Sequence, residues 1–130
     1  MAKFVTPLGK IDVTIIGHAS VLIEWNGRKI MTDPYSEIAD YTRQPVADLI
    51  LITHDHYDHL DTTALKPVTG KETVIISTPA VARLLPGVKP LKQGESFTYE
   101  GLHITATYAY NIEQKNEEGK VFHPKGAGNG

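Results

Sequence analysis

The sequence predicts an α/β sandwich. Short apolar runs rich in β-branched residues recur along the chain, as expected for strands buried on one or both faces. Helix-start signals follow two of these runs, at Asp61 and at Thr78-Pro79. A late hairpin signal, Glu100-Gly101, comes after both of them. Strands that first alternate with helices and then form a hairpin are typical of layered α/β architectures.

The first elements are three strands in succession, which we expect over residues 11–16, 21–25 and 28–32. Gly17-His18 separates the first strand from the second. Asn26-Gly27 is the signal for a type I′ hairpin, which returns the chain as the third strand. Asp33-Pro34 ends that strand, because proline cannot donate a hydrogen bond to a ladder.

The middle of the chain holds the most apolar strand, over residues 48–53. Before it, residues 35–47 mix polar side chains with two tyrosines and a proline, which indicates a loop or a short irregular helix. After it, Asp61 is placed to cap a short helix over residues 62–66, which Pro67 limits.

The later elements begin with a buried strand over residues 73–77. Thr78 is then the expected N-cap of a helix with Pro79 at its first position, and Pro86-Gly87 stops this helix. The remaining predictions are a short strand and the two strands of the hairpin, over residues 88–92, 96–99 and 102–109.

Composition narrows the classes of function. The chain has 130 residues, enough for one compact domain, and its net charge of -2 gives no basic bias toward nucleic acid. No apolar run approaches the ~20 residues of a membrane span, and the N-terminus lacks the pattern of a secretion signal. Cysteine is absent, which excludes thiolate ligands. We therefore expect a cytoplasmic protein that binds neither nucleic acid nor membranes.

Three of the six histidines fall in one short stretch, His54-Asp55-His56-Tyr57-Asp58-His59, directly after the buried strand. Imidazole nitrogens and carboxylate oxygens are the ligands of zinc and of harder divalent metals. In an extended segment His54 and His56 would point the same way and grip one ion. Asp58 and His59 follow after a bend and diverge toward a second position. The spacing therefore predicts two metals, one at each pair.

This sequence resembles the metallo-β-lactamase superfamily, whose hallmark is H-x-H-x-D-H after a buried strand. Two further stretches, at residues 16–24 and 28–34, resemble its small metal-dependent hydrolases related to the ascorbate-phosphate lactonases. The resemblance implies an αββα sandwich of two similar halves. Because it covers only the first half and a little more, we expect a half or partial sandwich, with a mixed sheet and helices on one face.

The resemblance also implies roles for the site residues. A hydroxide that bridges two metals would attack an ester, lactone or phosphoester, with Asp58 and His59 at the catalytic centre and Asp58 able to accept a proton. Asp33 would steady a metal-binding histidine without touching the metal. Zinc suits three imidazoles and a carboxylate best, and manganese and iron accept the same ligands. The substrate implied is a small anionic molecule.

Four more residues are candidates for this site. His18 lies at a break between two strands, where it is as readily a loop residue bonded to backbone as a contact of metal or substrate. Asn111 stands where the family commonly has another metal-binding histidine, and its amide oxygen is a weak ligand for zinc. His123 and Lys125 offer a further ligand and an anchor for an anion, or belong to a tail with neither role.

The sequence departs from the family after the late strand, where the bridging aspartate and the last metal-binding histidine are missing. We therefore divide it into a half-domain over residues 1–110 and a glycine-rich tail over residues 111–130. We expect one of three arrangements: a piece of a longer enzyme, a chain that pairs with a complementary C-terminal half, or a homodimer that imitates both halves. A metal-binding half-domain without catalysis is the alternative function.

Overall fold

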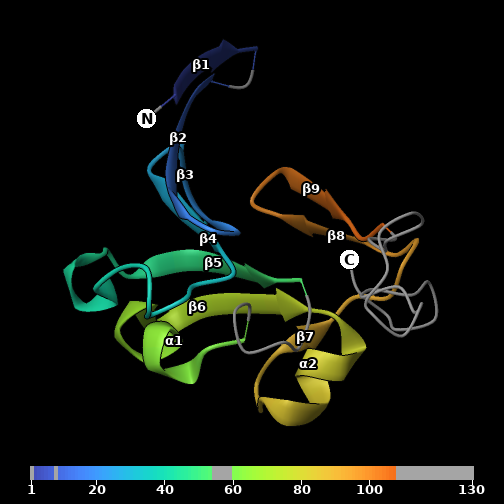
Figure 1. The fold of residues 1–130 in the computed structure, drawn as a ribbon. Helices are drawn as coiled ribbons and strands as arrows, with labels where there is room; N and C mark the ends of the chain where they lie inside the picture. Colours follow the sequence, from blue (N-terminus) through green and yellow to red (C-terminus); the bar gives the residue numbers. More distant parts are fainter. Residues whose placement is uncertain (1, 8, 54–59, 108–130) are drawn as a thin grey trace, which may run out of the picture.

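The computed structural model describes residues 2–7, 9–53 and 60–107 (Figure 1). Its main feature is a seven-stranded sheet in which the strands follow one another in sequence order. These strands are β1 (Ala2–Thr6), β2 (Gly9–Gly17), β3 (Ser20–Trp25), β4 (Arg28–Thr32), β5 (Ala47–Ile52), β6 (Thr69–Ser77) and β7 (Lys89–Pro90). Neighbours from β1 to β4 are antiparallel, and neighbours from β4 to β7 are parallel. The sheet is mixed, as the sequence predicts.

Helices cover one face of the sheet and a hairpin covers part of the other (Figure 1). The helices are α1 (Thr62–Val68), α2 (Pro79–Leu84) and the single-turn 3₁₀ helix η1 (Tyr41–Arg43). The hairpin is formed by β8 (Ser96–Tyr99) and β9 (Leu102–Thr105). Each layer has its own core: Ile50 packs with Val68 on the helix side, and Leu49 packs with Ile104 on the hairpin side. The prediction of helices on one face is confirmed.

Local signals in the sequence place the helix starts and the tight turns. The Asp61 side chain accepts hydrogen bonds from the first turn of α1, and Thr78 does the same for α2. At Asn26-Gly27 both residues have positive φ, 49° and 73°, as a type I′ turn requires. Glu100-Gly101 repeats this geometry with 48° and 86°. These predictions rest on contacts within a few residues and are confirmed.

Helix α1 differs from the prediction at its end. It continues through Pro67 to Val68 instead of ending before the proline. Pro67 lies in the last turn, and the Thr69 hydroxyl donates to the Leu65 carbonyl at 2.7 Å. That side-chain bond satisfies a carbonyl at the helix C-terminus.

Four strands also differ from expectation. Strand β1 was not predicted, and β6 begins four residues early, at Thr69 instead of Thr73. Strand β7 is reduced to Lys89–Pro90, and Pro90 has no N–H with which to extend the ladder. Strand β9 ends at Thr105, so the predicted strand to residue 109 is too long within the described residues; residues 108 and 109 lie outside them.

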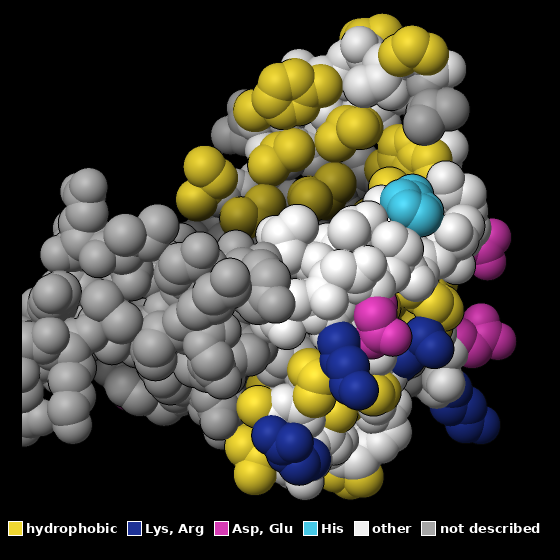
Figure 2. All heavy atoms as spheres, turned by 90° about the vertical axis from the view of Figure 1, so that its right-hand side faces the viewer, with side chains coloured by type: hydrophobic (Ala, Val, Ile, Leu, Met, Phe, Trp, Pro, Cys, Tyr) yellow, Lys and Arg dark blue, Asp and Glu magenta, His cyan; other side chains and the backbone are white. Residues whose placement is uncertain are grey.

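One face of β1, β2 and the start of β3 is apolar and uncovered by any described element (Figure 2). Paired residues share a face, and Phe4 pairs with Ile11 while Ile15 pairs with Val21. Phe4 is 53% exposed and Ile15 is 74% exposed. We call this surface the bare face: Ala2, Phe4, Ile11, Val13, Ile15 and Val21. The core beneath the β8–β9 hairpin, on the same side of the sheet, extends across β4, β5 and β6 and reaches Ile23 of β3.

None of the helices within the described ranges is long and apolar enough to cross a membrane.

Candidate metal centre

The candidate site begins where β4 and β5 end side by side. The two strands are parallel, with Thr32 beside Leu51, so the residues that follow them meet at one edge of the sheet. Asp33 follows β4 and Thr53 follows β5. The Asp33 N–H donates to the Leu51 carbonyl at 2.9 Å, which extends the ladder by one residue. Ligand sites of α/β sheets are found at such strand ends.

Both oxygens of the Asp33 carboxylate accept hydrogen bonds from Thr53. Oδ1 accepts from the Thr53 N–H at 2.8 Å, and Oδ2 accepts from the Thr53 hydroxyl at 2.7 Å. Only 2% of Asp33 is exposed to solvent. A buried carboxylate needs such donors, because burial without them is strongly unfavourable. Thr53 directly precedes His54, so Asp33 fixes the backbone from which the histidine-rich stretch starts.

The backbone of Asp33 is also constrained. Its φ is +37°, a value that aspartate adopts more readily than most residues with a Cβ. The buried Ser20 hydroxyl donates to the Asp33 carbonyl, and the Thr32 hydroxyl donates to the Ala19 carbonyl at 2.9 Å. The turn between β2 and β3 thus supports the end of β4 from the side.

Asp61 anchors the other end of the histidine-rich stretch. Its Oδ2 accepts from the Ser36 N–H at 2.8 Å and from the Ser36 hydroxyl at 2.6 Å. Its Oδ1 accepts from the N–H groups of Thr63 and Ala64 at the start of α1. Burial raises the pKa of the Asp61 carboxyl, but these hydrogen bonds outweigh it and hold that pKa below its ordinary 3.8.

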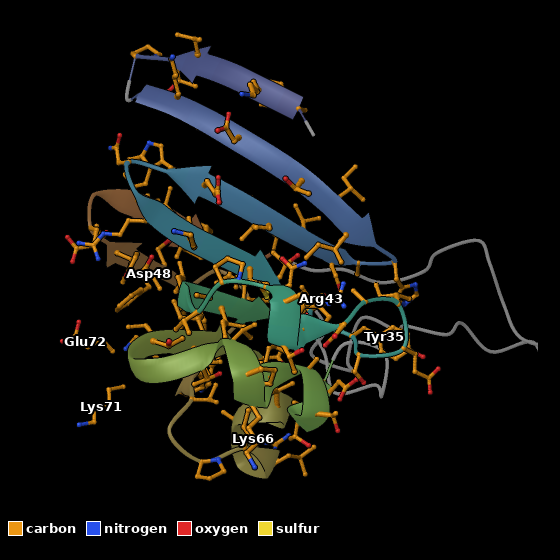
Figure 3. All side chains as sticks on the ribbon, turned by 90° about the vertical axis from the view of Figure 1, so that its left-hand side faces the viewer. Tyr35, Arg43, Asp48, Lys66, Lys71 and Glu72 are labelled. Atoms are coloured by element: carbon orange, nitrogen blue, oxygen red, sulfur yellow. The ribbon has the colours of Figure 1, made fainter. Side chains whose placement is uncertain are left out.

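His18 lies beside the segment that follows β4. Its ring centroid is 5.7 Å from that of Tyr35, with the two planes tilted by 49°. Its φ is +52°, in the left-handed region, and its side chain is exposed. Figure 3 shows Tyr35 at the end of the sheet opposite Asp48, so His18 lies at the same edge as Asp33.

Seven of the predicted site residues lie outside the described residues: His54, His56, Asp58, His59, Asn111, His123 and Lys125. Within the described ranges, no three histidine, aspartate or glutamate side chains come together in a way that could hold a metal. Residues 54–59 carry three imidazoles and two carboxylates, a donor set that fits a divalent metal in number and chemistry. The described residues supply the frame around this set.

A cavity of about 190 Å³ opens next to Thr53, between the sheet and the β8–β9 hairpin. Its lining is mostly apolar and includes Leu51, Ile52, Ile76, Leu91 and Ile104. Neither this cavity nor the role of Ser36 follows from the sequence. Ser36 and Asp61 are 25 residues apart, and no local pattern links them.

Comparison with known proteins shows the family of this chain. Residues 12–128 match a family model described as a beta-lactamase superfamily domain. A metal-dependent hydrolase from Shouchella clausii is 32% identical over 116 residues, which are 83% of this chain and 51% of that protein. An N-acyl-phosphatidylethanolamine-hydrolyzing phospholipase D from Caenorhabditis elegans is 36% identical over 74 residues, 44% of this chain and 21% of that protein.

The fold has a counterpart among solved structures. The crystal structure of a candidate metal-dependent hydrolase from Parabacteroides distasonis superposes with a TM-score of 0.89 at 37% identity. The match covers 99% of this chain and 58% of that one. The chain therefore spans about half the length of the relatives it matches.

Proposed function

We propose that this chain forms the metal-binding part of a metal-dependent hydrolase. The premise is that it belongs to the metallo-β-lactamase superfamily, in which its matched relatives are named metal-dependent hydrolases. The observation that carries the proposal is the buried Asp33 carboxylate, which holds Thr53 directly before the histidine-rich stretch. A scaffold that fixes the start of a ligand set is what a preorganised metal site needs.

His54 and His56 would hold one divalent ion, and Asp58 and His59 a second. When bound, these ions lower the pKa of water and polarise the bond to be cleaved. Zinc is the metal we expect first, with manganese and iron as alternatives. The protein's own groups supply the rest: Asp58 accepts a proton from the attacking water, and Asp33 keeps the start of the ligand stretch in place.

Three substrate classes fit this chemistry: esters, lactones and phosphoesters. In each, water adds across a C–O or P–O bond: an ester or phosphoester gives an acid and an alcohol, and a lactone opens to a single hydroxy acid. The similarity to a phospholipase D supports a phosphoester. The apolar cavity next to Thr53 could receive an apolar group attached to the reacting centre. Lys125 would anchor a small anionic substrate.

The first experiment uses the chain reconstituted with zinc, manganese or iron and then desalted. Metal per chain is measured by elemental mass spectrometry, and hydrolysis is measured with p-nitrophenyl acetate, a γ-lactone and bis(p-nitrophenyl) phosphate. Exchanging His56 and Asp58 together for alanine should abolish both metal binding and hydrolysis. His103→Asn is the matched control, because His103 is exposed on β9 and faces away from the hairpin core. The proposal fails if the double variant retains both properties.

A second function, a metal-binding half-domain without catalysis, is favoured by one observation. The bare face is an apolar surface that no described element covers, and the P. distasonis protein has more chain than this one matches. An exposed apolar sheet face of this kind is a site of protein–protein association. This function predicts metal binding with no turnover of any of the three substrates, and chelator-sensitive hydrolysis by the pure chain would exclude it.

The occupant of the bare face that we propose is a complementary C-terminal half. The match leaves about two fifths of the P. distasonis chain unaccounted for, enough for a second sheet that packs about 10 Å from the first. Light scattering of the chain, alone and with that portion of the P. distasonis protein, tests this proposal. A one-to-one complex supports it. A homodimer that ignores the added half would show that a second copy is the occupant instead.

A further inference from the structure

A four-residue segment after β4 contacts both flanks of the histidine-rich stretch. This segment, residues 33–36, is called the clamp below. Its first residue binds Thr53, just before the stretch, and its last residue binds Asp61, just after it. The four hydrogen bonds join residues that are 20 and 25 positions apart in the chain.

The two contacts are of the same chemical kind. In each, one carboxylate accepts from both the N–H and the hydroxyl of one residue. In the first contact the carboxylate is that of Asp33, in the clamp. In the second it is that of Asp61, in the flank. Hydrogen bonds to an ionised acceptor are about twice as strong as neutral ones. Both flanks are therefore held firmly, and to the same short segment.

The second contact reaches further than the first. Asp61 binds Ser36 through Oδ2 while its Oδ1 caps α1. The clamp is thereby joined to the helix that follows the stretch. Because Asp33 continues the β4 ladder, the separation between Thr53 and Asp61 is fixed from β4 on one side and from α1 on the other.

We propose that Ser36 and Asp61 are positioning residues for the metal site. They hold the two flanks of the ligand stretch at a set separation before any metal binds. The entropy cost of bringing the donors together then falls mostly on folding rather than on metal binding. This inference rests on the proposed function and adds two residues that the sequence pattern does not indicate.

The test is the apparent Kd for zinc, measured by competition with a chromogenic chelator. Ser36→Ala removes one hydrogen bond and leaves the Ser36 N–H bond to Asp61 in place. We expect its Kd to rise roughly tenfold, the lower end of the range for residues that support metal ligands. Ser36→Thr keeps the hydroxyl and should restore the wild-type Kd. Asp61→Asn leaves one acceptor oxygen where the carboxylate has two, so it weakens the same contact and should weaken zinc binding at least as much.

Thr42→Ala is the matched control. The Thr42 hydroxyl donates to Asp40, the N-cap of η1, just as Ser36 donates to the N-cap of α1. Its Kd should equal that of the wild type. Unfolding of the metal-free variants in urea separates positioning from stability, since a purely structural bond would shift the midpoint and leave the Kd alone.

The outcomes distinguish the two proposals. A wild-type chain that binds no zinc overturns both the proposed function and this inference. A wild-type chain that binds zinc, together with S36A and D61N variants that bind it equally well, overturns the inference alone. If S36A does not fold, the apparent Kd of D61N for zinc is compared with that of Thr42→Ala. Equal values overturn the inference.

Discussion

Phe4 and Val5 are neighbours in β1 and lie on opposite faces of the seven-stranded sheet. Phe4 pairs with Ile11 on the bare face, whereas Val5 pairs with Lys10 on the face that also carries Lys3 and Asp12. Their exposed fractions are 53% and 84%. Substitutions at these two adjacent apolar residues therefore test the two faces of the sheet separately.

Phe4→Lys should weaken binding of the complementary half, and Val5→Lys should not. Burial of a phenylalanine side chain contributes about 1.5–3 kcal/mol, which corresponds to roughly tenfold or more in Kd. Fluorescence anisotropy with a labelled C-terminal half measures the difference. Equal effects of the two variants would mean that the bare face is not the interface.

Asp33→Asn should lower both the free energy of unfolding and the bound metal. The amide has one acceptor where the carboxylate has two, so one Thr53 donor loses its partner at a cost of about 2 kcal/mol. Asp48→Asn is the control, since Asp48 accepts from the Lys29 N–H near the other end of β5. It should cost less than about 1 kcal/mol and leave the metal content unchanged. Urea unfolding and elemental analysis measure the two effects, and full metal content in the Asp33 variant would contradict the proposed role.

Tyr41→Phe should stabilise the protein. Tyr41 is 2% exposed, and its hydroxyl has no hydrogen-bond partner among the residues that the structure describes. A buried hydroxyl without a partner costs about 1–3 kcal/mol, so its removal should raise the free energy of unfolding by roughly 1 kcal/mol. Chemical denaturation followed by circular dichroism measures the change. A loss of stability would show that the hydroxyl has a partner in the folded protein.

His18→Asn should raise KM and leave the metal content unchanged. Asparagine tolerates the left-handed backbone of His18, so stability should stay within about 0.5 kcal/mol of the wild type. The ring that contacts Tyr35 is lost, and with it a side chain at the edge of the site. Steady-state kinetics and elemental analysis on the same sample test this. Loss of metal would instead place His18 among the ligands.

Metal stoichiometry should depend on the complementary half. Four ligands shared between two ions leave each ion short of the three protein ligands that a catalytic zinc usually has. We expect one zinc or fewer per isolated chain and about two per complex. At a hundredfold excess of free zinc over Kd, the bound ion should add about 2.7 kcal/mol to the free energy of unfolding, and a chelator should remove this gain. Two tightly held ions in the isolated chain would contradict this expectation.

Features set by nearby residues could be predicted from the sequence. Asn26-Gly27 fixes a turn, and Asp61 and Thr78 start helices, because in each case the deciding hydrogen bonds span at most three residues. Strand β1 could not be predicted in this way. The first four residues of β1 are exposed, and only the pairing of β1 with β2 makes it a strand.

The candidate site likewise has features that the sequence predicts and features that it does not. The metal-ligand pattern at His54 to His59 and the aspartate at the end of β4 are visible in the sequence, although the ligands themselves lie outside the described residues. The contact between Ser36 and Asp61 and the cavity next to Thr53 arise only when distant segments meet. Such contacts depend on the tertiary fold, which local patterns do not encode.

The change from antiparallel to parallel pairing at β4 has a kinetic consequence. Strands β1 to β4 join through short turns, so their contacts are local and can form early. The pairing of β4 with β5 closes a much longer loop and is expected to form later. Asp33 and Thr53 meet only at that step. The nascent chain should therefore present its histidines to free metal ions before the frame around them exists, and any ion captured then would have to be released or rearranged as β5 docks.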